Sequence, residues 1–345
     1  MEIHFTSLHQ IDHALDSVKE VDIRSQGQDL TDYTKRLITE ITEGTSKRKF
    51  RFKRDTTEVR GVIADFITGN YEGKEINAKR LMDVEQKAQE AIAHLNKEIQ
   101  KGSLFQAHLQ NGKTSIVVIS KADQQQFLSN EDFNLKSGLP WEKKIFKAFL
   151  ARIEGNNVVE TFVYDTSARL ATYWWDKFLE LEEVYTSSFN TKTALKLLDS
   201  KVLNSLKKKF KADHTSIRNK VVGYFQSQPT FEMQTFLETV ITEYQPISAD
   251  FPKTKTIEKI KDLPDKYSFD SQFPIAPEEV KARKIRNNIP LSDGMDLVLK
   301  QNIPELDSTV NAFADEEGRK YIAIRTDSGY EYFKSKDEVS ENNQG

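Results

Sequence analysis

The spacing of hydrophobic residues along the first half of the chain predicts both helices and antiparallel strands. Residues 2–11 read as a strand, and apolar residues three and four positions apart predict helices over 30–43 and 76–101. Asn111-Gly112 lies between two strand-like runs, which is the sequence signal typical of a tight β-hairpin. Two more runs, 147–153 and 158–164, predict a second antiparallel pair, although the first run also fits a helix. The N-terminal region is therefore expected to be a mixed α/β region with antiparallel strands.

Helical spacing then continues to about Tyr244, and strands return toward the C-terminus. The stretch ARLATYWWDKFLELEEV (168–184) predicts the first helix of this middle region, while GMDLVLKQ, RKYIAIRT and GYEYF predict strands. The overall expectation is an α+β fold with a helical middle and a β-rich C-terminal part. The predicted regions are an N-terminal α+β domain (1–165), a helical region (166–245), a β-rich region (246–335) and a polar tail (336–345).

Composition narrows the class of protein. The chain has 345 residues, 37% of them hydrophobic and 30% charged, which indicates a globular protein of two or three domains. Cysteine is absent, so disulfides and thiol nucleophiles are excluded. The N-terminus lacks the pattern of a signal peptide and no apolar run reaches 18 residues, so we expect a cytoplasmic protein without a membrane span.

Motifs for catalysis and cofactor binding are missing from the sequence. No Walker loop, Gly-x-Gly-x-x-Gly or Gly-x-Ser-x-Gly motif occurs. His4, His9 and His13 lie close together in sequence, but no further ligand stands at a fixed spacing from them. We therefore predict no enzymatic activity, no catalytic residue, no metal and no cofactor.

A metal-dependent nuclease is the enzymatic alternative that the sequence leaves open. Such sites combine an Asp with a Glu-x-Lys strand, and Glu72 and Glu142 each begin a Glu-x-Lys triplet with an Asp upstream. With 50 Lys+Arg and 53 Asp+Glu in the chain, matches of this kind arise by chance.

Clusters of Lys and Arg are the strongest chemical signal. The formal net charge is −3, so a DNA-binding surface would have to be a local patch on a mildly acidic protein. The clusters are KRKFRFKR (47–54), the lysines within 201–211, and KARKIR (281–286), which precedes a strand predicted over 294–300. The candidate DNA-binding residues are Lys47, Arg48, Lys49, Arg51, Lys53, Arg54, Lys207, Lys208, Lys209, Lys211, Lys281, Arg283, Lys284 and Arg286.

Each cluster also has a structural explanation. Phe50 and Phe52 can face the core instead of stacking on bases, lysines suit the C-terminal end of a helix, and 281–286 can be a solvated approach to a strand. Acidic residues around the tryptophans could neutralise one of the clusters within the fold, and the sequence does not say which. These are Asp176, Glu180, Glu182 and Glu183.

The helix predicted over 76–101 bears on assembly. Its apolar residues recur at nearly heptad spacing, so the stripe either packs on its own domain or contacts a second copy. Because symmetric dimers are the commonest soluble assembly, we predict a homodimer.

Three segments resemble the bacterial nucleoid-associated protein family of the YejK (NdpA-like) type. They are 112–153 (GKTSIVVISK…FLARI), 158–180 (VVETFVYDTSARLATYWWDKFLE) and 273–303 (FPIAPEEVKARKIRNNIPLSDGMDLVLKQNI), followed by GRKYIAIRT. The likeness covers about residues 100–335, and the N-terminal third more loosely. The resemblance implies a cytoplasmic protein of the nucleoid that is associated with DNA and has no enzymatic activity. It supplies no individual DNA-contacting residues.

Taken together, these patterns favour a non-enzymatic, nucleoid-associated protein that binds DNA largely independently of sequence through local basic patches. DNA contact through another protein of the nucleoid also stays open. The alternative is an interaction protein that binds a DNA enzyme or a defence-system partner through an acidic surface.

Overall fold

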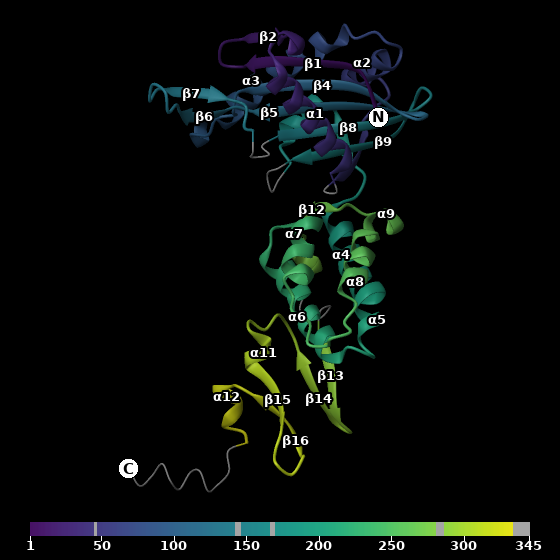
Figure 1. The fold of residues 1–345 in the computed structure, drawn as a ribbon, viewed down its shortest axis with the longest axis vertical. Coiled ribbons are helices and arrows are strands. Elements are labelled where there is room, and N and C mark those ends of the chain that lie inside the picture. Colours follow the sequence, from purple (N-terminus) through teal and green to yellow (C-terminus); the bar gives the residue numbers. More distant parts are fainter. Residues whose placement is uncertain (45–46, 142–145, 166–169, 281–285, 334–345) are drawn as a thin grey trace. The chain divides into compact units, whose positions relative to one another are not determined.

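The fold was obtained as a computed structural model, which describes residues 1–333 apart from 45–46, 142–145, 166–169 and 281–285 (Figure 1). It is an α+β fold, as predicted. The chain divides into two compact units, and each is assembled from segments that are far apart in sequence. Unit 1 comprises 1–194, 229–235 and 262–276, and unit 2 comprises 195–228, 236–261 and 277–345.

Unit 1 contains an antiparallel sheet of eight strands in the order β10-β3-β9-β8-β5-β4-β1-β2. The predicted hairpin at Asn111-Gly112 is confirmed, because β4 and β5 pair from Gly102↔Asp123 to Asn111↔Thr114. Gly112 has a φ of +60°, which glycine adopts without steric cost. The strands expected at 147–153 and 158–164 are also confirmed as the paired strands β8 and β9.

The elements of residues 1–183 are β1 (Glu2–Asp12), β2 (Ser17–Val21), α1 (Gln28–Glu43), β3 (Arg48–Phe52), α2 (Glu58–Ile67), α3 (Gly73–Ile92), β4 (Gly102–Asn111), β5 (Thr114–Asp123), β6 (Gln125–Leu128), β7 (Leu135–Gly138), β8 (Phe146–Glu154), β9 (Asn157–Asp165), a π-helix (Tyr173–Phe178) and β10 (Leu181–Glu183).

Helices cover both faces of this sheet (Figure 1). On one face, residues of α2, α3 and the π-helix pack with Phe50, Leu104 and Val117. On the other face, Leu37, Ile38 and Ile41 of α1 pack against alternate residues of β4, β5 and β8. Both faces of β4 and β5 are buried: β5 carries the continuous apolar run 116–119, whereas β4 also buries the polar residues Gln106 and His108.

Helix α3 ends earlier than the sequence pattern predicts. The helix was expected to run to Lys101, but it ends at Ile92, and Asn96 adopts a left-handed conformation with φ 51°. Leu81 is fully buried in the core of unit 1, whereas Leu95 is half exposed and lies beyond the helix. The first half of the apolar stripe therefore packs on its own domain.

The helix predicted over 168–184 is confirmed only over Tyr173–Phe178, and the prediction is wrong for 181–183, which form a strand. Its described part forms the short π-helix, and Glu180, with a φ of 53°, ends the helical stretch before β10. Strand β10 pairs antiparallel with β3, with Glu182 opposite Arg51. The Arg51–Glu182 pair is exposed and adds little, whereas Leu181 of β10 is fully buried in the core of unit 1, so strand pairing and burial explain this segment better than the local helical pattern does.

Unit 2 combines a helical part with small hairpins. The Asp293-Gly294 step lies between β13 and β14, and a second hairpin is formed by β15 and β16. The strand predicted for GYEYF is wrong, because Gly329 and Tyr330 belong to a short helix, α12. Thr326 begins this helix by accepting a hydrogen bond from the Gly329 N–H at 3.1 Å.

The elements after residue 183 are α4 (Ser187–Leu197), a π-helix (Leu198–Leu203), α5 (Asn204–Leu206), α6 (Lys211–Ser227), β11 (Thr230–Glu232), α7 (Met233–Leu237), a π-helix (Glu238–Thr242), α8 (Lys253–Lys261), α9 (Leu263–Tyr267), β12 (Gln272–Pro274), β13 (Asn287–Ser292), β14 (Met295–Leu299), α11 (Leu306–Thr309), β15 (Val310–Ala314), β16 (Lys320–Ile324) and α12 (Asp327–Tyr330).

Candidate nucleic-acid interface

Strand β3 carries the first basic cluster, and its side chains alternate between the two faces of the sheet. Phe50 is buried in the core of unit 1, and Phe52 packs against that core with its ring edge-on to Phe149 at 5.9 Å. Neither ring is free to stack on a base. Arg48 is on the same face as Phe50 and is buried, while Arg51 on the opposite face is exposed.

Five of the six cations in this cluster lie beside carboxylates. Arg48 Nη2 is 2.7 Å from Glu183 Oε1, and Arg51 Nε is 2.7 Å from Glu182 Oε1. Most of the partners come from β10 and the residues just before it, which are the acidic residues that the sequence marked as able to neutralise a basic cluster. The pairs are Arg48 with Glu183, Lys49 with Glu160, Arg51 with Glu182, Lys53 with Asp176, and Arg54 with Glu180.

Lys47, the sixth cation, is held differently. Its ammonium donates a hydrogen bond to the Thr42 carbonyl oxygen at 3.0 Å. Burial, and then the charge of Arg152, lower the pKa of Lys47 below its ordinary value. A phosphate that approached β3 would have to displace a carboxylate at each of the other five cations, so the charge of this cluster is largely compensated within unit 1.

The second cluster lies at the junction between α5 and α6 in unit 2. Helix α5 ends at Leu206, so Lys207, Lys208 and Lys209 follow a helix C-terminus, whereas Lys211 is the first residue of α6, where attraction to a helix C-terminus does not apply. Lys207, Lys208 and Lys211 are exposed, and no carboxylate of the described residues lies within 4.0 Å of their ammonium groups. Lys209 differs, since it pairs with Asp250.

The third cluster lies mostly outside the described residues. Lys281, Arg283 and Lys284 fall in the segment 281–285, whereas Arg286 is described and is exposed immediately before β13. The strand expected after this cluster is present as β14, which is paired with β13.

Helix α8 contributes further cations, although its lysines do not form a continuous cluster in the sequence. Lys259 Nζ lies 3.4 Å from Ser205 Oγ on α5, which places α8 beside the second cluster. The helical part of unit 2, residues 195–228 and 236–261, contains twelve Lys and Arg and six Asp and Glu. Its net charge is therefore +6 with histidine neutral. This positive charge becomes visible only when the charges of residues that belong to one folded unit are added together, and the sequence alone does not say which residues those are.

The residues considered for catalysis do not form a nuclease arrangement where the structure describes them. Glu72 and Lys74 lie at the start of helix α3, not on a strand, and Lys74 pairs with Glu20. Glu142 lies outside the described residues. The three N-terminal histidines also diverge, because His13 lies 3.6 Å from Glu85 while His4 stacks edge-on against His108.

Comparison with known proteins supports the resemblance seen in the sequence. Within the described residues, every helix is too short or too polar to span a membrane. A comparison with curated proteins gave no match. The family described as nucleoid-associated protein YejK matches residues 7–322, which include the N-terminal third where the resemblance was looser. The chain therefore belongs to the nucleoid-associated protein YejK family.

Proposed function

We propose that the chain is a non-enzymatic protein of the bacterial nucleoid, and therefore of the cytoplasm, that binds duplex DNA directly. The contact would be made by a lysine surface on unit 2, defined as Lys207, Lys208, Lys211 and Lys259. Membership of a nucleoid-associated family supports a role at DNA. The observation that carries the proposal is that the first three of these lysines are exposed without a carboxylate partner in the described structure.

Lysine side chains suit this role because each ammonium is a compact charge that contacts phosphate oxygens without reading base edges. The local charge of +6 in the helical part of unit 2 attracts the DNA backbone even though the whole chain carries −3. Binding of this kind is largely independent of sequence. Of the three basic clusters in the sequence, the second therefore becomes the main candidate.

The salt dependence of binding tests the proposal. Log K for binding falls as log salt rises, and each neutralised phosphate makes this fall steeper by about 0.9 on duplex DNA. Changing Lys207, Lys208 and Lys211 together to Gln should weaken binding and make the slope shallower by about 2.7. Fluorescence anisotropy with a labelled duplex at several salt concentrations measures both quantities.

The matched control is a triple change on β3, Lys49→Gln, Arg51→Gln and Lys53→Gln. These cations already have carboxylate partners, so the slope should stay close to that of the unmodified protein. If instead the salt slope becomes shallower in the β3 variant and stays unchanged in the lysine-surface variant, the DNA contact lies on unit 1. An unchanged slope in both variants would reject both surfaces.

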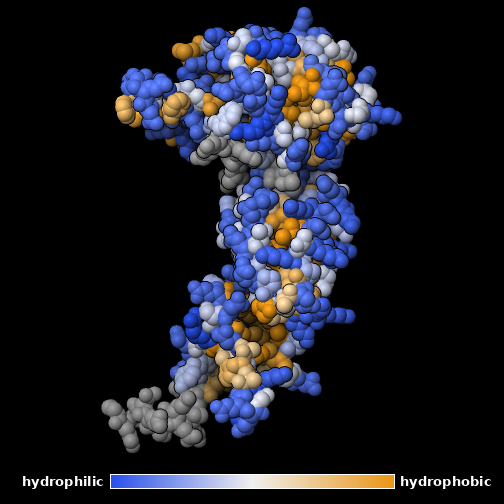
Figure 2. All heavy atoms as spheres, viewed as in Figure 1, coloured by the Kyte–Doolittle hydropathy of each residue, from blue (hydrophilic) through white to orange (hydrophobic). Residues whose placement is uncertain are grey.

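A second candidate function rests on the C-terminal hairpins of unit 2. Residues 287–333 contain nine Asp and Glu but four Lys and Arg, and aromatic side chains such as Phe313 and Tyr332 are exposed. Figure 2 shows hydrophobic side chains gathered at the surface of this part of the chain. Exposed apolar groups in an acidic segment suit a basic protein partner, in agreement with the alternative of an interaction protein.

A further inference from the structure

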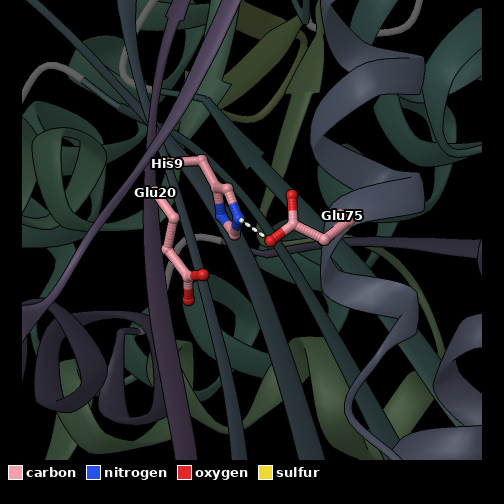
Figure 3. A group of neighbouring side chains, drawn as sticks. All are labelled: His9, Glu20 and Glu75. Carbon is pink, nitrogen blue, oxygen red and sulfur yellow. Dashed lines mark hydrogen bonds and ion pairs between the residues drawn. The ribbon is translucent and has the colours of Figure 1, made fainter.

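Three side chains from different elements of unit 1 converge at one end of its sheet. His9 belongs to β1, and its direct cross-strand neighbour on β2 is Glu20. Glu75 lies in the first turn of α3, which packs over these two strands. Figure 3 shows the imidazole of His9 directed between the two carboxylate side chains.

The ligand atoms of this group are close enough to share one ion. One nitrogen of His9 and one carboxylate oxygen each of Glu20 and Glu75 lie within 4.8 Å of one another. His9 is fully buried, its Nε2 is 3.3 Å from Glu75 Oε1, and its Nδ1 has no hydrogen-bond partner in the described structure. The unpartnered Nδ1 shows that protein groups satisfy only one side of this buried imidazole, and Nε2, beside Glu75, is the nitrogen placed to bind an ion.

The charges of the group also favour a cation. Carboxylate oxygens of Glu20 and Glu75 lie within 4.8 Å of each other, and Lys74 is the ammonium that pairs with Glu20. With His9 neutral, two carboxylates and one ammonium leave a formal charge of −1. The side chain of Lys74 is long and partly exposed, so its ammonium can move away when a stronger cation binds Glu20.

We propose that His9, Glu20 and Glu75 form a binding site for a divalent first-row transition ion such as Zn²⁺ or Mn²⁺. One imidazole nitrogen and two carboxylate oxygens are ligands that these ions accept, whereas Mg²⁺ and Ca²⁺ prefer oxygen ligands alone. Three protein ligands leave coordination positions for water. The ion would join the β1–β2 hairpin to the first turn of α3, so that binding would stabilise unit 1.

Titration of the full-length chain with Zn²⁺ alone, and separately with Mn²⁺ alone, tests this site. Calorimetry should show one ion per chain, and saturating ion should raise the melting temperature of unit 1 by about 5 °C. For Mn²⁺, electron spin echo spectroscopy should show the nitrogen coupling of a bound imidazole. This last signal separates a site that contains His9 from carboxylates that hold an ion loosely.

The informative variants are Glu20→Gln and Glu75→Gln, because both side chains are about half exposed and can be changed without disturbing the core. Each should weaken binding by about tenfold to 100-fold, while the melting temperature without metal stays near that of the parent. Glu72→Gln and His4→Ala are the matched controls, since they change a carboxylate and an imidazole of unit 1 that lie outside the group, and they should leave binding unchanged.

His9→Ala should remove the nitrogen coupling. Because His9 is buried, this variant can also lose stability for reasons unrelated to metal, so the test relies on the two glutamine variants. The proposal is overturned if neither ion binds one to one. It is also overturned if the Glu20→Gln plus Glu75→Gln double variant binds as tightly as the parent, which would mean an adventitious ion only.

Discussion

At the scale of single residues, the neighbours of a charged side chain decide what it can do. Six cations in KRKFRFKR read as a patch for a polyanion, yet Arg48 is buried against Glu183, and Arg51 faces Glu182 across the β3–β10 pair. The partners are about 130 residues away in sequence. By contrast, Lys207 and Lys208 look like an ordinary helix terminus in the sequence, and they are exposed without described carboxylate partners.

Asp270 is the residue whose ionisation should be visible in stability. Burial raises its pKa to about 6, although the Lys49 N–H, the Asn190 amide and Arg48 all favour its charged form. The folded protein therefore holds this proton more tightly than the unfolded chain does. The stability that follows is fully present below about pH 4 and is lost as the pH rises through about 6, by about 3 kcal/mol.

Comparison with Asp270→Asn isolates this contribution, because the variant cannot ionise. Chemical denaturation of both proteins from pH 4 to pH 7 should show the parent losing stability relative to the variant as the pH rises. Asp213→Asn is the control of opposite sign. Burial acts to raise the pKa of Asp213, but hydrogen bonds from Ser248 and Tyr244 leave it lowered. Its contribution is therefore complete above about pH 4 and is lost only below that pH, so the series for this control is extended to about pH 2. A pH-independent difference for Asp270→Asn would contradict the assignment.

At the scale of elements, local patterns predicted most of the sheet and the first helices. The turn at Gly112, the two strands β8 and β9, and the buried face of α1 all follow from spacing and turn chemistry within short windows. The failures share a different cause. β10 is too short to be recognised alone and pairs with β3. Helix α3 ends at Ile92, and the 3-10 turn that follows it ends at the left-handed Asn96.

The same distinction applies to the candidate site. Local charge density identified the lysines at 207–211, but the contribution of α8 depends on packing that brings Lys259 beside Ser205. Likewise, His9 and Glu75 are 66 residues apart and meet because α3 crosses the β1–β2 hairpin. A sequence window cannot contain such a pair.

Helix α3 supports a prediction that separates folding from assembly. Leu81→Ala should lower the free energy of unfolding by about 2–5 kcal/mol, because Leu81 is fully buried in the core of unit 1.

Ala88→Asp plus Leu95→Asp should change that stability little, since neither side chain is buried, but should convert the proposed dimer to a monomer. Sedimentation at micromolar concentration measures the assembly. A monomeric parent would exclude the dimer, and a dimer that survives the double change would place the contact elsewhere.

At the scale of the whole molecule, opposite charges are separated along the chain. The helical part of unit 2 carries +6 within a protein of net charge −3, and the described hairpin segment 287–333 carries −5. A single net charge conceals this arrangement. One chain can therefore present a cationic surface to DNA and an acidic, apolar surface to a basic protein, so the two candidate functions are compatible.

The separation of charge leads to a prediction about sequence preference. If lysine contacts to phosphates dominate, AT-rich and GC-rich duplexes of equal length should bind with affinities within about tenfold of each other, whereas specific binders prefer their sites by about 10³–10⁷. Both duplexes should show the same salt slope. The Lys207→Gln, Lys208→Gln, Lys211→Gln variant should lose the same factor on each, because phosphates are identical in both. A strong preference for one duplex that survives in this variant would show that other residues read the bases. If the purified chain binds neither duplex at low salt, the link to DNA would run through a partner protein, and the acidic hairpins would become the surface to examine.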